Sequence, residues 1–171
     1  MISVSTIFDD NTLSLIARIA ARKYKYQCYI LAFVFLIAGS LLNILTINSV
    51  LYEIFWLASC LFYLHRPRTY YKKVLKQYHT REREIFQTPR TVWTTFEDEQ
   101  ISSITIDNNN TLEVKYSTIS KLYETDAYLM IMTQGKQCLP IPKDQISNGS
   151  SQDLIAFLQE KAPTLKHIKI K

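Results

Sequence analysis

The sequence predicts an α+β protein in which a transmembrane α-helical hairpin precedes a small antiparallel β-sheet domain with a C-terminal helix. Three observations predict this fold class: two neighbouring apolar stretches, an alternation of apolar and polar residues after Pro89, and an amphipathic segment near the chain end. Only 3 of the 171 residues are glycine and 5 are proline, while 47% are hydrophobic, which excludes collagen-like, proline-rich and wholly disordered classes.

Residues 1–26 are predicted to form an N-terminal strand and a juxtamembrane helix. Residues 2–8 alternate between apolar and polar side chains, as a short strand does. The polar residues 9–12 can cap a helix, and Leu13 and Ile16 begin an apolar stripe that continues toward the first apolar stretch.

Residues 27–66 are predicted to form a two-helix transmembrane hairpin. Residues 28–47 carry no charge, and 20 residues at 1.5 Å rise span about 30 Å, the thickness of a hydrocarbon core. Their twelve Leu, Ile, Phe and Val residues favour insertion by about 4–7 kcal/mol. Residues 50–64 form the second stretch, after a turn at 48–49. Its one charge, Glu53, is expected at the membrane rim, and a proton or ion relay through Glu53 is the functional alternative.

Basic residues flank both ends of the predicted hairpin and are absent from its turn. The positive-inside rule therefore predicts a protein of the cytoplasmic (inner) membrane with two spans and both termini in the cytoplasm. We expect eight cations to contact lipid headgroups: Arg22, Lys23, Lys25, Arg66, Arg68, Lys72, Lys73 and Lys76. Residues 1–89 carry a net charge of +6 and residues 90–171 a net charge of −1, so no nucleic-acid partner is expected.

After the second stretch, residues 67–89 are predicted to form a basic stalk helix. Apolar residues recur there at helical spacing as far as Ile85, and Pro89 then ends the helix. This helix is expected to leave the bilayer and lead to the C-terminal domain.

Residues 90–171 are predicted to form a cytoplasmic antiparallel sheet with a C-terminal helix. Five β-rich runs lie at 91–97, 101–106, 111–116, 127–133 and 136–141, with turns at 97–99, 108–110 and 134–136. Ile119 and Leu122 are expected to lengthen or follow the third strand. Ser150 or Ser151 caps a helix whose first turn holds Asp153 and which ends before Pro163.

No motif predicts catalysis or cofactor binding. The three cysteines share no C-x-x-C spacing, and the three histidines share no H-x-x-x-H spacing. The chain also lacks the G-x-S-x-G, P-loop and dinucleotide-binding patterns. We therefore expect a protein that is not an enzyme, with no catalytic residue, no metal and no cofactor.

The run VKYSTISKLYETDAYLMIM at residues 114–132, followed by LPIPK at 139–143 and an amphipathic helix, resembles the bacterial YcxB-like family. In that family a W-S-D-I-type strand, an aromatic-rich strand and an I-P-K motif follow a short N-terminal strand and a two-span membrane hairpin. Tyr116 stands where the family usually has Trp, and Thr118 where it usually has Asp. The resemblance implies a pleckstrin-homology-like (PH-like) sheet with a C-terminal helix, held at the inner face of a bacterial membrane.

Two functions are consistent with this sequence. The first is a membrane-anchored cytoplasmic interaction module whose sheet binds a lipid headgroup, a peptide or a membrane protein. The second is an immunity or resistance protein whose hairpin protects the membrane against a toxin or bacteriocin. Exchanging the hairpin for an unrelated one is expected to spare the first function and abolish the second. The sequence predicts no oligomeric state.

Overall fold

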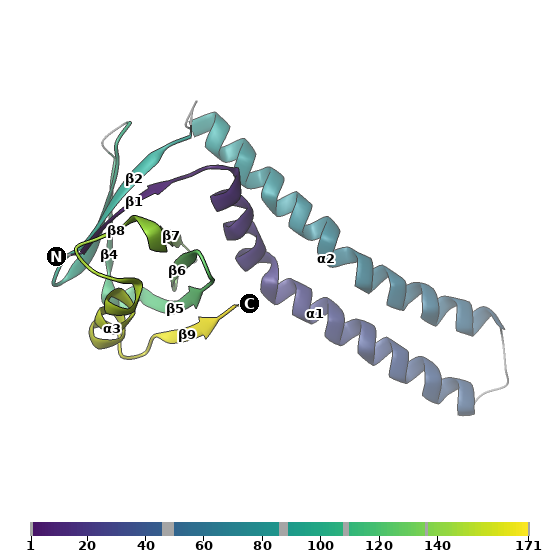
Figure 1. Cartoon of the computed structure of the whole chain (residues 1–171). Helices are drawn as coiled ribbons and strands as arrows, with labels where there is room; N and C mark the ends of the chain where they lie inside the picture. The colour runs from purple at the N-terminus through teal and green to yellow at the C-terminus, as the bar shows by residue number, and fades with distance from the viewer. Residues whose placement is uncertain (1, 46–49, 86–88, 108–109, 136, 171) are drawn as a thin grey trace. The chain divides into compact units, whose positions relative to one another are not determined.

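The computed structural model describes the chain except residues 1, 46–49, 86–88, 108–109, 136 and 171, and it confirms the mixed α+β class (Figure 1). The chain forms two compact units: Met1–Thr12 with Phe86–Lys171, called here the sheet unit, and Leu13–Ile85, the helical unit. The sequence-based division instead placed the first strand with a juxtamembrane helix at residues 1–26 and made the residues from 90 onward a separate domain. Pairing between strands distant in the sequence accounts for the difference.

The sheet unit contains two sheets. One has the order β4-β3-β2-β1-β8, and all its neighbours are antiparallel: β1 (Ile2–Ile7), β2 (Thr91–Phe96), β3 (Gln100–Thr105), β4 (Thr111–Lys115) and β8 (Ile146–Ser147). The other has the order β7-β6-β5-β9: β5 (Ile119–Glu124), β6 (Tyr128–Thr133), β7 (Cys138–Pro142) and β9 (Lys166–Lys169). Strand β9 is parallel to β5, whereas the other pairs in this sheet are antiparallel.

Strand β1 pairs with β2 along its whole length, from Ile2 opposite Phe96 to Ile7 opposite Thr91. The predicted strand at residues 2–8 is therefore present, and it is an inner strand of the first sheet. Both helices of the helical unit are inserted in the chain between two strands that are hydrogen-bonded to each other.

The core of the sheet unit lies between the sheets and helix α3 (Ser151–Lys161). Strands β5 and β6 contribute the fully buried Leu122 and Leu129, and α3 contributes Leu154 and Leu158. Alternate residues of β1, β2 and β3 are buried as well, which is the period-two pattern expected for a half-buried sheet, whereas β4 buries only Val114.

Helix α3 begins with a capping box, and of the two serines predicted as the cap it is Ser150 that occupies that position. The Ser150 hydroxyl accepts a hydrogen bond from the Asp153 N–H at 3.2 Å, and the Asp153 carboxylate accepts one from the Ser150 N–H at 2.8 Å. The helix ends at Lys161, two residues before Pro163.

Three features of the sheet unit differ from the sequence-based expectation or complete it. A 3₁₀ turn at Tyr116–Thr118 separates β4 from β5, so Ile119 and Leu122 belong to a separate strand. Strands β8 and β9 were not predicted, because two residues in one case and a short lysine-rich tail in the other carry no strand periodicity. The turn at 97–99 is present, and the predicted turns at 108–110 and 134–136 lie partly outside the described residues.

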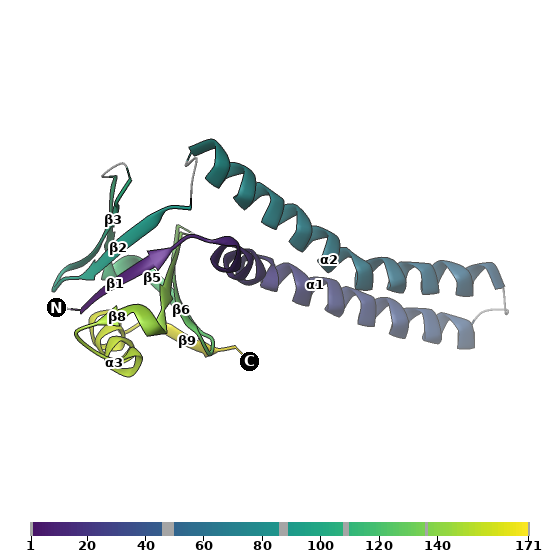
Figure 2. The same ribbon diagram turned by 45° about the horizontal axis from the view of Figure 1, so that its top comes forward.

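The helical unit consists of α1 (Asp10–Leu45), whose first turn belongs to the sheet unit, and α2 (Val50–Ile85), which run antiparallel (Figures 1 and 2). Phe35 of α1 lies between Trp56 and Tyr63 of α2, with ring centroids at 5.5 and 5.3 Å. A Cβ on Gly39 would lie 2.9 Å from Cγ of Trp56, so glycine permits this close approach. The predicted turn at 48–49 lies outside the described residues, as do the side chains of residues 43–45 and 50–53, including Glu53.

Helix α2 is continuous from Val50 through Pro67 to Ile85. The stalk helix predicted at residues 67–89 is therefore, as far as Ile85, a continuation of the helix that contains residues 50–64. Proline removes one backbone N–H donor, yet the described helix continues on both sides of it.

Candidate membrane-facing surface and polar cluster

A continuous set of large apolar side chains is exposed on the two helices. On α1, Ile30 and Phe33 are 62% and 63% exposed, and on α2, Leu57 is 64% exposed. We call this set the apolar band; its members are Ile30, Leu31, Phe33, Val34, Leu36, Ile37, Leu41, Leu42, Ile54, Phe55, Leu57, Leu61, Phe62 and Leu64. Water-exposed patches of this size are rare on soluble monomers and are typical of surfaces that face lipid or another apolar partner.

Within the described residues, one helix, at Asp10–Leu42, is long and apolar enough to cross a membrane. Only 11% of its most apolar stretch is buried inside the structure. A core helix of a soluble protein would instead be mostly buried, so this helix is suited to an apolar solvent.

The eight cations predicted to contact headgroups lie on the helical unit, before Ile30 along α1 and after Leu64 along α2. Seven have exposed side chains, and Arg22 is half-buried. The ring centroids of Tyr24 and Tyr70 are 4.2 Å apart, so the basic segments of α1 and α2 lie at the same level of the helix pair. We call the eight residues the basic collar: Arg22, Lys23, Lys25, Arg66, Arg68, Lys72, Lys73 and Lys76.

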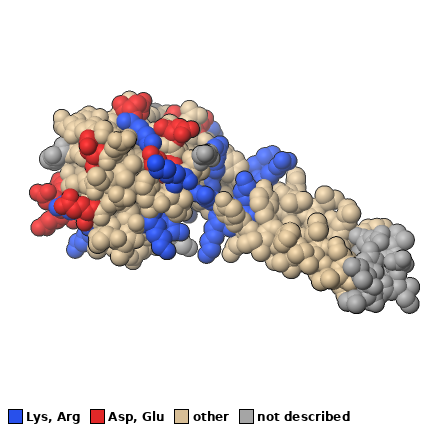
Figure 3. Space-filling model, turned by 60° about the horizontal axis from the view of Figure 1, so that its bottom comes forward, with Lys and Arg blue, Asp and Glu red and all other residues tan. Residues whose placement is uncertain are grey.

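Three collar cations lie over aromatic rings of their own helix, four residues away. Arg22 lies 5.7 Å from the Tyr26 ring centroid, and Lys25 lies 5.6 Å from that of Tyr29. On α2, Arg66 lies 5.0 Å from the centroid of Phe62. This spacing places cation and ring on one helix face, where each pair contributes about 0.5–1 kcal/mol. Figure 3 shows blue side chains where the charge-free tan surface of the helices ends.

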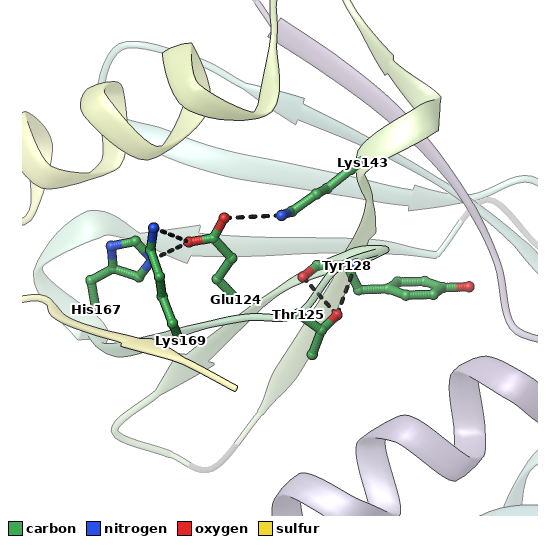
Figure 4. Close-up of polar contacts among 6 residues, drawn as sticks. All are labelled: Glu124, Thr125, Tyr128, Lys143, His167 and Lys169. Atoms are coloured by element: carbon green, nitrogen blue, oxygen red, sulfur yellow. Dashed lines mark hydrogen bonds and ion pairs between the residues drawn. The ribbon is translucent and has the colours of Figure 1, made fainter. Parts of the chain in front are cut away.

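A second feature is a polar cluster in the sheet unit, centred on the Glu124 carboxylate at the end of β5 (Figure 4). Lys143 Nζ donates to Glu124 Oε1 at 2.9 Å, and His167 Nε2 lies 2.8 Å from Glu124 Oε2. Lys169 Nζ lies 3.8 Å from the same Oε2. The hydrogen bond from Lys143 is the largest cause that lowers the pKa of Glu124; it outweighs partial burial, and His167 and Lys169 also favour the charged form.

The polar cluster connects three segments of the sheet unit through hydrogen bonds and ion pairs. Glu124 belongs to β5, Lys143 begins the 3₁₀ turn after β7, and His167 belongs to β9. The backbone adds to this, since the Ile170 N–H donates to the Glu124 carbonyl at 2.7 Å. Because its carboxylate already accepts from two side chains, Glu124 is suited to holding the last strand in place.

Sequence reasoning missed this cluster. Glu124 and His167 are 43 positions apart, and a parallel pairing of β5 with β9 brings them together. A short strand of four residues gives no periodic signal that could have predicted that pairing.

Two further titratable groups in the described part of the sheet unit have raised pKa values. Burial raises the pKa of Cys138 to about 12, so its thiol stays protonated and is a poor nucleophile. Burial also raises the pKa of Tyr116, whose hydroxyl donates to the Glu97 carbonyl at 2.6 Å. Across the described residues, no group of three or more His, Cys, Asp or Glu side chains is placed to hold a metal ion.

Comparison with protein families finds that residues 96–158 match the model described as YcxB-like protein. The matched region extends from the last residue of β2 to Leu158 in α3, and it contains both runs, at 114–132 and 139–143, that suggested this resemblance. The match supports the YcxB-like family. It lies wholly within the sheet unit and does not extend to the helical unit. No curated protein matches the chain.

Proposed function

We propose that this protein is a membrane-anchored interaction module, not an enzyme. In this proposal, α1 and α2 cross a bacterial inner membrane as a two-span hairpin. The sheet unit, a PH-like domain, binds a lipid headgroup, a peptide or a membrane protein on the cytoplasmic side.

The observation that carries the proposal is the pairing of β1 with β2. Ile7 and Thr91 are opposite each other in one sheet, so both ends of the intervening chain lie on the same side of any membrane. That chain must therefore cross an even number of times. If α1 crosses once, as its length and composition allow, a second crossing must return the chain, and we assign that crossing to residues 50–64 of α2.

The basic collar supports the proposed orientation. Lys and Arg are enriched at the cytoplasmic ends of membrane helices, and each gains about 1 kcal/mol near an anionic surface. The three collar cations that lie over aromatic rings would sit at headgroup level, where amphipathic aromatic side chains accumulate.

The strand order supports a PH-like domain. Along the chain, β1–β4 form one antiparallel set, β5–β7 form a second, and α3 follows them. A fold does not identify a ligand, so the proposal rests on the membrane anchor formed by α1 and α2. A module held at a membrane meets membrane-bound partners at an effective concentration up to the millimolar range.

The anchoring half of the proposal is tested with a C-terminal epitope tag on the full chain. We expect the tag to resist protease added to intact spheroplasts and to be cleaved in inverted membrane vesicles. Cleavage in intact spheroplasts, or release of the protein by alkaline carbonate, would contradict the proposed topology.

The binding half is tested by photo-crosslinking in native membranes. The native chain is compared with a chain whose residues 28–64 are replaced by an unrelated two-span hairpin. An interaction module should capture the same membrane partner in both forms. If the exchanged chain stays in the membrane but loses capture, the hairpin carries the function, as the immunity alternative requires.

A further inference from the structure

Strand β4 is the end strand of the first sheet, and its outer backbone edge is open. The Thr105 N–H donates to the Asn110 carbonyl at 2.9 Å, which fixes the alternation of the ladder: residues 110, 112 and 114 direct their backbone groups toward β3. The N–H and C=O groups of Thr111, Glu113 and Lys115 therefore point away from the sheet. These three residues are also exposed, so the edge is accessible to another strand.

The charges on this edge are opposite and two residues apart. Glu113 and Lys115 lie on the same face of β4, opposite Ser102 and Gln100 of β3. Within the described residues neither side chain forms an ion pair. Like charges on an edge strand prevent pairing, whereas this pattern is complementary to itself when a second strand runs antiparallel.

The charge pattern selects one register for such self-pairing. A two-fold axis at Val114 places Glu113 of each copy opposite Lys115 of the other, which gives two favourable cross-strand pairs. In that register the outward backbone groups of residues 113 and 115 face one another, as a hydrogen-bonded pair requires. A two-fold axis at Glu113 would instead place the Glu113 carboxylates of the two copies opposite each other, where they repel.

We propose that two copies of this chain associate through antiparallel pairing of their β4 strands about Val114, so that the first sheet continues across the dimer. The Lys115 carbonyl accepts a bond from the Thr118 hydroxyl at 2.7 Å and keeps its second lone pair for the new strand. Pairing through a five-residue strand gives only a weak association in solution. The proposed membrane anchor confines both copies to one surface, which raises their local concentration and so favours the dimer.

The test uses the full chain in proteoliposomes, prepared as an equal mixture of ¹⁴N- and ¹⁵N-labelled protein. A zero-length carbodiimide couples a carboxylate to an amine only where the two are in contact. We expect mass spectrometry to find Glu113 joined to Lys115 in peptides that combine both isotopes, which shows that the bond links two copies.

Charge exchange supplies the matched variants. Each single variant lacks either the carboxylate or the amine that the carbodiimide couples, so the dimer fraction is measured by energy transfer between copies that carry a donor or an acceptor fluorophore. Glu113→Lys and Lys115→Glu each turn two attractive pairs into two repulsive ones, so either should lower the dimer fraction about tenfold. The double variant E113K/K115E restores opposite charges and should restore the dimer. Glu160→Lys, the same change of charge on exposed α3, should have no effect.

Three results would overturn the dimer. The crosslinked peptides could each contain only one isotope, the dimer fraction could be unchanged in both single variants, or the dimer fraction could stay low in the double variant. A product that joins Glu113 to a lysine elsewhere on the second copy would overturn the proposed register. In cell membranes, a crosslink between β4 and a different protein would contradict the proposal that β4 pairs with a second copy of this chain. Flotation of every variant with the liposomes tests the anchor separately, so failure of the dimer and failure of the anchor are distinguishable.

Discussion

Replacement of Glu124 by Gln tests the polar cluster with little change in side-chain volume. The backbone bond from the Ile170 N–H is retained, but the charge that accepts from Lys143 at 2.9 Å and lies 2.8 Å from His167 is lost. A hydrogen bond to a charged group contributes about 1.5–3 kcal/mol, and the Gln oxygen can replace one of the two acceptors. Since the Glu124 side chain is 17% exposed, we expect a net loss of about 2 kcal/mol.

The loss should depend on pH in a defined direction. The pKa of Glu124 is lowered below its ordinary value of 4.5, so the folded state favours the charged carboxylate. Its stabilisation is therefore complete above the unfolded pKa and disappears as the pH falls through the folded pKa. The difference between wild type and Glu124→Gln should be full near pH 7 and should close well below pH 4.5.

The assay is thermal unfolding of the full chain in detergent, followed by Trp93 fluorescence in a Trp56→Phe background. For a domain of about 100 residues, a loss of about 2 kcal/mol lowers Tm by roughly 10 °C. Glu99→Gln, in the exposed turn between β2 and β3, is the matched control and should change stability by less than about 0.5 kcal/mol. An equal effect of both variants, or a gap that persists at low pH, would refute the role assigned to Glu124.

Further predictions concern the helix pair, the core and the cap. Gly39→Leu should separate the helices, because even a Cβ meets Trp56 at 2.9 Å; cysteine crosslinking between α1 and α2 should fall severalfold, whereas Ser40→Leu on the exposed face should leave it unchanged. Leu129→Ala, at a fully buried position, should cost about 2–5 kcal/mol in urea unfolding, and a loss below 1 kcal/mol would contradict its place in the core. Ser150→Ala removes the acceptor for the first turn of α3 and should cost about 1 kcal/mol; hydrogen exchange should rise in α3 before it rises in β6.

Local patterns predicted the local structure of this chain well. Alternation of apolar and polar residues predicted β2, β3 and β4 to within about one or two residues, and Ser150 with Asp153 predicted the start of α3. These features depend on neighbouring residues, so a sequence window contains the information needed to predict them.

Non-local pairing was beyond the reach of those patterns. The sequence indicates that residues 2–7 form a strand, but not that their partners are residues 91–96. For the same reason the sequence did not predict β9 or the polar cluster at Glu124. Both depend on a parallel pairing of β5 with β9, which brings together Glu124 and His167, 43 positions apart. The positions of the basic collar on the two helices could be predicted, because its members flank the two apolar stretches in the sequence. Their contact with lipid headgroups stays a prediction.

The placement of the two helices between β1 and β2 has a consequence for biosynthesis. The ribosome makes Ile7 84 positions before its partner Thr91. At about 5–20 residues per second, the first strand therefore waits roughly 4–17 s before the second is available. Sheet closure thus comes after both helices have been translated, and until then the nascent first strand lacks its native neighbour and is a substrate for chaperones.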